Sequence, residues 1–388
     1  MACKNPKNTI DTTTDRNSKM SKINVGLIGT GFMGKAHVFG FATAQRAFDL
    51  PVDFYMEMVA DASQELASAA GKALGFSRHT ADWRDIINDP DIDLVNITAP
   101  NALHKEIALA AITAGKHVYC EKPLAPSVPD ALEMTHAAER AGIKTQVGFN
   151  YLTNPMFQLA KEMIEAGELG EIYAYRGVHA EDYMASPNAP ISFRHDKIGG
   201  GALADIGSHA LATAQFLLGP ISQVSGNSKT LIPQRPDATG MLHRVEVDDI
   251  THILIEFESG VNGSVEANWC ATGRTMQHDF EIYGSRGALF FSQERLNELH
   301  FYDALQPQGR RGFRRIEAGP YHAPYGRFCV AAGHQIGFND LKSIEIAKFA
   351  DAIAGNTSEP FNFRAGYQIQ HLVETIAKSA QQRCWLKI

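Results

Sequence analysis

The stretch Ile23–Lys35, INVGLIGTGFMGK, decides the fold of this chain because its glycines follow the spacing G-x-G-x-x-G. At such a turn from a strand into a helix, Gly29 permits the sharp turn, Gly31 lets a pyrophosphate approach the backbone, and Gly34 lets the helix pack closely on the strand. The free N–H groups at the start of that helix can hold the phosphates. The predicted dinucleotide-binding residues of this turn are Gly29, Thr30, Gly31, Phe32, Met33 and Gly34.

Asp61 follows a second predicted strand, Val52–Ala60. A carboxylate at the end of that strand can accept hydrogen bonds from both ribose hydroxyls of an adenosine and would repel a 2′-phosphate, so Asp61 favours NAD over NADP. An alternative role for Asp61 is the N-cap of a helix that begins near Ser63. The two roles are compatible.

The composition of the chain is that of a soluble globular protein with room for two domains. It has 388 residues, a formal net charge of −7 and a pI near 6.1, which offers no basic surface for nucleic acid or anionic lipid. Its five cysteines form no C-x-x-C pair, which favours reduced thiols in the cytoplasm and gives no metal-binding spacing. No apolar run approaches the ~18 residues that a membrane span requires.

The first 21 residues are polar and predict a disordered leader without a secretory signal. Met20 lies just before the first predicted strand. Either Met1 or Met20 is therefore a candidate for the true start of the chain.

From residue 22 to 148, strand and helix patterns alternate, which predicts a Rossmann-type, doubly wound parallel sheet. Ligands of such sheets bind at the carboxyl ends of the strands. The predicted strands are 23–28, 52–60, 77–80, 93–98, 117–120 and 144–149, and the predicted helices are 32–48, 64–74, 82–88, 104–114 and 129–141. Besides the glycine turn and Asp61, the predicted cofactor-binding residues at this edge are Thr98, Pro100, Asn101, His104, Glu121 and Lys122.

From residue 149 to 388 the pattern predicts an α+β domain for substrate binding and oligomerisation. Strands with alternating polarity and short turns predict a largely antiparallel open sheet in the form of a meander. The predicted strands are 172–179, 221–231, 250–258, 261–269, 277–283 and 288–292, and the predicted helices are 157–166, 201–218, 343–354 and 367–380. We expect the C-terminal helices to pack back on the first domain.

Lys122 stands in a Glu-Lys-Pro sequence at the end of a predicted strand. Pro123 ends that strand and fixes the local backbone, which gives the lysine a rigid support. Its ammonium group can donate to a hydroxyl or ketone oxygen of a substrate and stabilise the negative charge that develops there. The alternative is an ordinary surface lysine.

Asp205 and His209 lie four residues apart in a predicted helix, so both side chains would project from one face. An imidazole can accept the proton of an alcohol as hydride leaves, and a neighbouring carboxylate would orient that imidazole. The alternative is a structural pair on a helix surface. The apolar remainder of the helix favours partly buried, functional side chains.

Other polar residues are less specific. Asn101 and His104 can bind near the nicotinamide ribose, and His104 can instead cap its helix. The loop before residue 199 is rich in groups that bind hydroxyls, or else forms plain surface; it contains His179, Asp182, Tyr183, Arg194 and His195. Its histidines lack the spacing of metal ligands, and hydride transfer to NAD needs no metal.

Taken in order, the motifs resemble the Gfo/Idh/MocA oxidoreductase family from about Lys22 to the C-terminus. The motifs are the glycine turn with Asp61, Pro100-Asn101-x-x-His104, Glu121-Lys122-Pro123, Gly148-Phe149-Asn150, Asp205-x-x-x-His209 and Tyr283-Gly284-x-x-Gly287. One departure is the interval from Gly34 to Asp61, which is longer than the usual ~20 residues.

The resemblance implies hydride exchange between NAD and a hydroxyl carbon of a sugar or cyclitol. It implies that Lys122 is the catalytic lysine, Asp205 the substrate-orienting carboxylate and His209 the proton acceptor. Tyr183 and Arg194, in the hydroxyl-binding loop, are further predicted substrate-binding residues. The loop 182–196 is similar to that of members acting on inositols, levoglucosan and L-glucose. The resemblance also implies a homodimer or homotetramer. Two alternatives remain open: an NAD-dependent glycoside hydrolase of the same fold, and a non-catalytic regulator that binds NAD and a sugar.

Overall fold

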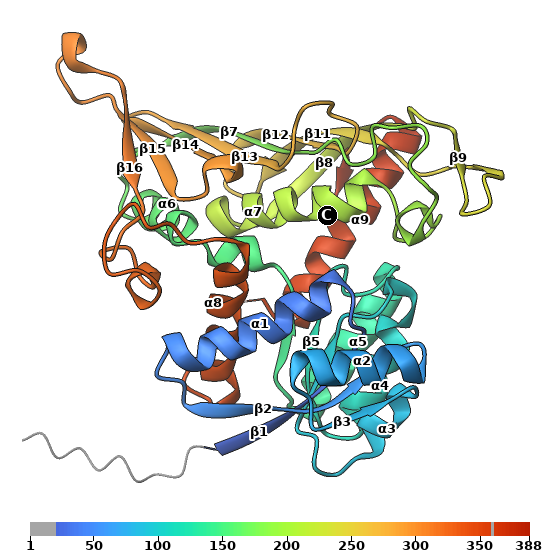
Figure 1. Ribbon diagram of the computed structural model, residues 1–388. Helices are drawn as coiled ribbons and strands as arrows, with labels where there is room; N and C mark the ends of the chain where they lie inside the picture. The colour runs from blue at the N-terminus through green and yellow to red at the C-terminus, as the bar shows by residue number, and fades with distance from the viewer. Residues whose placement is uncertain (1–20, 358–360) are drawn as a thin grey trace, which may run out of the picture.

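The computed structural model describes residues 21–357 and 361–388 (Figure 1). The predicted leader lies outside the described residues except for Ser21, which begins the first strand, β1 (Ser21–Ile28). No helix within the described part of the chain is long and apolar enough to cross a membrane.

The N-terminal half is a six-stranded parallel sheet in the order β3-β2-β1-β4-β5-β6, which confirms the predicted doubly wound fold. Its central strands are short apolar runs with both faces buried, as parallel strands between helices must be. The other strands are β2 (Val52–Ala60), β3 (Arg78–Thr80), β4 (Leu94–Ile97), β5 (His117–Cys120) and β6 (Thr145–Val147). The helices are α1 (Phe32–Ala47), α2 (Gln64–Leu74), α3 (Trp83–Asn88), α4 (His104–Thr113) and α5 (Val128–Ala141).

Local sequence explains where several of these helices begin and end. Ser63 caps α2 by accepting a hydrogen bond from the Leu66 amide, and Ser127 caps α5 in the same way from Asp130. Gly75 and Gly142 end these two helices in the left-handed conformation. Since Ser63 is the cap of α2, the alternative role of Asp61 as that cap is wrong.

The C-terminal half is built on a nine-stranded, mostly antiparallel sheet in the order β16-β15-β14-β13-β7-β12-β11-β8-β17. It is not a simple meander, because β7 lies between β13 and β12 and runs parallel to β12. Its strands are β7 (Ile172–Ala180), β8 (Ile221–Lys229), β11 (Ile250–Phe257), β12 (Asn262–Asn268), β13 (Gln277–Gly284), β14 (Gly287–Ser292), β15 (Glu298–Asp303), β16 (Phe313–Glu317) and β17 (Leu386–Lys387). The sequence patterns missed β15, β16, β17 and the small hairpin of β9 (Gln234–Pro236) and β10 (Leu242–Arg244).

Helices α6 (Pro155–Glu165), α7 (Ser208–Leu218) and α9 (Phe363–Gln382) lie on one face of this sheet (Figure 1). Helix α8 (Phe338–Ile353) returns to the N-terminal half and packs on α1. Gly40 permits that contact, because a Cβ atom there would lie 2.7 Å from Ile346 and 2.9 Å from Lys342. Ile346 and Phe349 join Val25 and Phe41 in one buried cluster.

The segment predicted as one helix from residue 201 to 218 has two parts. Leu203–Gly207 form a π-helical turn, and the α-helix α7 begins only at Ser208. Wider turns of this kind occur often at functional sites. The change matters because Asp205 lies in the π turn and His209 in the α-helix, so the regular spacing assumed for the pair does not apply.

Candidate active site

The three glycines of the turn have surroundings that fit the roles expected from their spacing. Gly29 has a φ of +94°, and a Cβ on Gly34 would lie 2.3 Å from the Gly29 carbonyl oxygen. A Cβ on Gly31, by contrast, would meet no protein atom within 4 Å. Gly31 is also the N-cap of α1 and offers no side chain to the free N–H groups of the first turn. The residues present therefore fit a pyrophosphate at this helix end.

Asp61 lies beside that turn, at the carboxyl end of β2. Its Oδ2 accepts hydrogen bonds from the amide of Thr30, at 2.9 Å, and from the Thr30 hydroxyl, while Oδ1 accepts from the amide of Ala62 at 2.7 Å. These bonds fix a carboxylate next to the glycine turn, a position that fits an adenosine ribose. The long interval between Gly34 and Asp61 is filled by the 16-residue α1 and the nine-residue β2.

Thr98, in the segment that follows β4, contacts the glycine turn. The Thr98 hydroxyl donates to the Gly29 carbonyl at 2.6 Å, so Thr98 fixes the backbone of the turn. Pro100 then starts a short 3₁₀ turn, Asn101–Leu103, which leads into α4. Asn101 is half-buried there and lies at the edge where the sequence places it.

Lys122 and Asp205 come together from the two halves of the chain. Nζ of Lys122, after β5, lies 2.8 Å from Oδ1 of Asp205 and donates to its main-chain carbonyl at 2.7 Å. Both side chains are mostly buried, with 16% and 19% of their surfaces exposed. Lys122 is therefore not an ordinary surface lysine.

The predicted substrate-binding residues Tyr183 and Arg194 meet the same carboxylate. The Tyr183 hydroxyl donates to Oδ2 of Asp205 at 2.8 Å, and Nε of Arg194 donates to it at 3.0 Å. Burial alone would raise the pKa of Asp205, but the charges of Lys122 and Arg194 outweigh burial and hold that pKa below its usual range. Asp205 is thus an anion in the centre of a cluster of hydrogen-bond donors.

His209 lies in the same region but is not bonded to Asp205. Its contacts among the described residues are ring contacts, with Tyr151 at 4.8 Å, His179 at 5.7 Å and Phe149 at 5.9 Å between ring centroids. Burial lowers its pKa well below the usual value, and the charge of Lys122 lowers it further. The expectation that a carboxylate orients the imidazole is therefore wrong. Aromatic rings and a second histidine surround His209, and burial with the charge of Lys122 keeps it neutral.

Behind His209 lies a group of polar side chains that the sequence patterns did not bring together. His179 and His278 stack with centroids 4.7 Å apart and an angle of 5° between their planes. Nε2 of His179 lies 2.9 Å from Oε1 of Glu181, and Nε2 of His278 lies 3.0 Å from the Thr213 hydroxyl. Burial, then the charge of Asp205, raises the pKa of Glu181 to about 7.

Glu121 belongs to a second cluster of polar side chains, which contacts the backbone of Lys122. Its Oε1 lies 3.0 Å from Nζ of Lys342 and 2.8 Å from Nε2 of His37, and its Oε2 accepts from the amide of Lys122 at 3.2 Å. Lys342 also bonds Glu345, at 2.7 Å, and the Tyr119 hydroxyl, at 3.0 Å. The prediction that Glu121 binds the cofactor is not supported by this position, because its oxygens face α1 and α8.

Two features of the sequence hint at this cluster. Gly148, part of the Gly-Phe-Asn motif, leaves room for the carboxylate, since a Cβ there would lie 2.2 Å from Oε1 of Glu121. Lys342 and Glu345 are charged residues three apart among the buried positions of α8. The predicted helix began at residue 343 and so left Lys342 out.

His104 has neither of its predicted roles. The ring is buried, with Nδ1 2.9 Å from the Pro123 carbonyl and Nε2 2.9 Å from the Ala99 carbonyl. Both ring nitrogens are therefore occupied by backbone and do not face the nicotinamide ribose. His104 instead links the segments that follow β4 and β5. Because Pro123 is the neighbour of Lys122 in the chain, this link helps to position Lys122.

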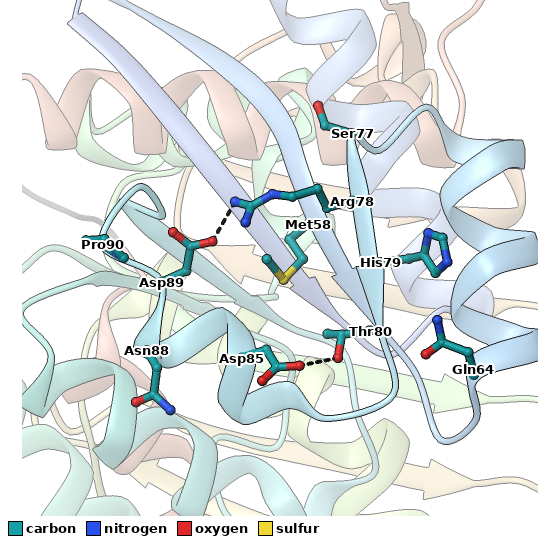
Figure 2. A pocket seen from close by; sticks show the side chains of 10 residues that line it. All are labelled: Met58, Gln64, Ser77, Arg78, His79, Thr80, Asp85, Asn88, Asp89 and Pro90. Carbon is teal, nitrogen blue, oxygen red and sulfur yellow. Dashed lines mark hydrogen bonds and ion pairs between the residues drawn. The ribbon is translucent and has the colours of Figure 1, made fainter.

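An open hollow of about 830 Å³ lies along the edge strand β3, away from this arrangement (Figure 2). Its polar groups pair with one another, as Arg78 does with Asp89 at 2.5 Å and Thr80 with Asp85 at 2.5 Å. None of the predicted site residues lines it. Within residues 21–357 and 361–388, no group of three or more His, Cys, Asp or Glu side chains is placed to hold a metal ion.

Two family models match the chain. An oxidoreductase family with an NAD-binding Rossmann fold matches residues 23–149, and the GFO/IDH/MocA C-terminal domain matches residues 157–290.

Among curated proteins, levoglucosan dehydrogenase of Pseudarthrobacter phenanthrenivorans is 41% identical over 95% of this chain and 99% of its own length. The NAD-dependent scyllo-inositol 2-dehydrogenase of Bacillus subtilis is 30% identical over 69% of this chain and 73% of its own length. A solved structure of levoglucosan dehydrogenase in complex with NADH and levoglucosan, 41% identical, superposes with a TM-score of 0.92 and covers 95% of this chain and 99% of that one.

Proposed function

Because this chain belongs to the Gfo/Idh/MocA family of NAD-binding oxidoreductases, we propose that it oxidises one hydroxyl carbon of a sugar or cyclitol, with the anhydrosugar levoglucosan as its foremost substrate. The observation that carries the proposal is the convergence of Lys122, Tyr183 and Arg194 on Asp205, beside His209 and at the edge that holds the dinucleotide turn. Such a cluster of donors around one anion suits a ring with several hydroxyl groups.

In this proposal Lys122 donates to the oxygen of the reacting carbon and lowers the cost of the negative charge that grows on it. Asp205 accepts from a neighbouring hydroxyl and, through its bond to Nζ, fixes the direction of the ammonium group. His209, kept neutral by burial, accepts the hydroxyl proton, a step typically worth about 10²- to 10⁴-fold in rate. Bound NAD supplies the nicotinamide ring that accepts the hydride.

We propose that the cofactor is NAD rather than NADP because Asp61 places a carboxylate beside the phosphate-binding turn. Residues 22–148 would bind NAD, and residues 149–388 would hold the substrate and form contacts between subunits. A homodimer or homotetramer is supported by exposed apolar side chains on the open sheet, such as Tyr173 and Leu254. A cytoplasmic location is supported by the scattered free cysteines among the described residues.

The decisive experiment measures NADH absorbance after the purified protein is mixed with NAD, or separately NADP, across anhydrosugars, inositols and aldoses. The proposal is supported if NADH forms with levoglucosan and NAD, and if kcat/KM for levoglucosan exceeds that for the other compounds of the panel. A higher kcat/KM with an inositol contradicts the substrate assignment. Silence across the panel, with NAD binding intact, contradicts the dehydrogenase itself and favours the hydrolase or the regulator. Light scattering of the purified protein would test the subunit number.

A further inference from the structure

Oxidation of an alcohol releases one proton per turnover, and in the proposed function that proton arrives on His209. The His209 residue is only 7% exposed, and its ring is enclosed by Tyr151, Phe149 and His179. A buried imidazole that has accepted a proton must lose it before the next cycle. We propose that His179 and Glu181 form the path by which this proton leaves His209 for solvent; the proposal rests on the proposed function.

The geometry of the path is a short series of groups that ends at the surface. The His179 ring, 1% exposed on β7, lies 5.7 Å from the His209 ring between centroids. Its Nε2 lies 2.9 Å from Oε1 of Glu181, whose side chain is 20% exposed. In the proposed path the proton crosses from His209 to His179 over this 5.7 Å separation of the ring centroids, through one bridging water.

The hydrogen bonds of His179 give the path a direction. When Glu181 is ionised it can only accept, so in that state Nε2 of His179 carries the hydrogen and donates it to Glu181. The other nitrogen, Nδ1, is then a lone pair, and it is buried without a hydrogen-bond partner among the described residues.

The transfer balances at each atom. The proton on His209 forms a bond to Nδ1 of His179, the Nε2–H bond of His179 breaks, and that proton bonds to Oε1 of Glu181. Glu181 releases it to water, and tautomer exchange returns the hydrogen of His179 to Nε2. One proton reaches solvent for each hydride transferred. His278, stacked on His179 and held by Thr213, keeps the relay ring in its plane.

The surrounding charges suit this role. The charged and titratable groups that act on Glu181 are Asp205, Lys122, Arg194 and Asp182, and those that act on His179 are Lys122, Asp205, His209 and His278. Burial and Asp205 raise the pKa of Glu181 to about 7, which lets it take up and release protons near neutrality. Burial and Lys122 lower the pKa of His179 to about 3, so His179 passes a proton on rather than holding it.

The test uses the full-length enzyme with Glu181→Gln and follows NADH formation by stopped flow. His209 can accept one proton without the relay, so the first turnover should keep its wild-type rate while later turnovers slow by about tenfold or more. Small proton carriers such as formate or imidazole should restore the steady rate, and KM for the sugar should be unchanged. The matched control is Glu266→Gln, since Glu266 faces His252 at 3.9 Å on the neighbouring strand and lies outside the path; it should behave as wild type.

Three results would overturn the relay: a wild-type steady rate in Glu181→Gln, a first turnover slowed as much as later ones, or a slow steady rate that no carrier restores. If the wild type oxidises no ring compound, the proposed function fails, and NMR still decides the relay. Labelled histidine should then show His179 protonated at Nε2, and the Glu181 carboxyl should titrate near 7. A His179 protonated at Nδ1, or a Glu181 that titrates near its ordinary value, refutes the path in either case.

Discussion

The ammonium group of Lys342 lies 3.0 Å from the carboxylate of Glu121, although 221 residues separate them in the chain. Lys342 has no exposed side-chain surface, and Glu121 has 8%. This buried ion pair joins α8, near the end of the chain, to the strand end that carries Lys122. Because Glu121 also accepts from the Lys122 amide, the pair helps to set the position of the proposed catalytic lysine.

Replacement of Lys342 by Met should destabilise the protein by about 3–5 kcal/mol, because it leaves the carboxylates of Glu121 and Glu345 buried without their cation. Chemical denaturation measures the loss. The matched control is Lys105→Met, which removes a lysine that also bridges two carboxylates, Asp130 and Glu133, but at the surface. That change should cost far less than Lys342→Met, because exposed ion pairs contribute little to stability. Equal losses in the two variants would contradict the importance of burial.

His37 should make the stability of the protein depend on pH. Burial, and then the charge of Lys342, lowers the pKa of His37 to about 4 from its ordinary 6.5. Between these values the unfolded chain binds a proton that the folded protein does not, so stability is fully present above about pH 6.5 and falls as the pH is lowered. Wild type should lose about 1.4 kcal/mol more per pH unit than His37→Gln in this window. Parallel pH profiles of the two unfolding free energies would refute this.

Replacement of Lys122 by Ala should abolish turnover and leave NAD binding largely intact. The ammonium group acts on the substrate oxygen, while Asp205 keeps its bonds from Tyr183 and Arg194 and the fold is preserved. Steady-state kinetics gives the first quantity, and quenching of protein fluorescence by NADH gives the second. Loss of both together would mean that Lys122 is structural.

Replacement of Asp61 by Ala should weaken the preference for NAD. The variant lacks the carboxylate that would accept from the ribose hydroxyls and repel a 2′-phosphate, so KM for NAD should rise by about tenfold or more and the ratio of NADP to NAD activity should increase. The measurement is kcat/KM for each cofactor with the same sugar. An unchanged ratio would place the adenosine ribose elsewhere.

Gly31 and Gly34 should separate cofactor binding from folding. A methyl group on Gly31 meets no protein atom, so Gly31→Ala should unfold as wild type does but bind NAD poorly, because the methyl group occupies the path of the pyrophosphate. A methyl group on Gly34 collides with the Gly29 carbonyl, so Gly34→Ala should cost about 1–3 kcal/mol of stability. Thermal melts with and without NADH distinguish the two. Full NADH stabilisation of Gly31→Ala would show that this space is not used.

Much of the nucleotide half could be predicted from the sequence because its signals are local. Apolar runs, caps and the glycine spacing fix the strands, the helices and the turn within a few residues. The strand ends then follow from the parallel sheet, which places the turn, Asp61 and Lys122 at one edge. In the second half, β7 enters the sheet between β12 and β13, a pairing that no local pattern encodes.

The sequence by itself determined which residues are available for chemistry: a dinucleotide turn, a lysine held by Pro123, and an acid and a histidine near residue 205. Only the tertiary structure decided their partners. Asp205 lies in a π turn and His209 in the α-helix that follows, and long-range packing joins Asp205 to Lys122 across 83 residues. Burial decided their charges as well. Removal of water keeps His209 neutral, raises the pKa of Glu181 and requires a cation beside the buried Glu121. Burial is a property of the folded chain alone.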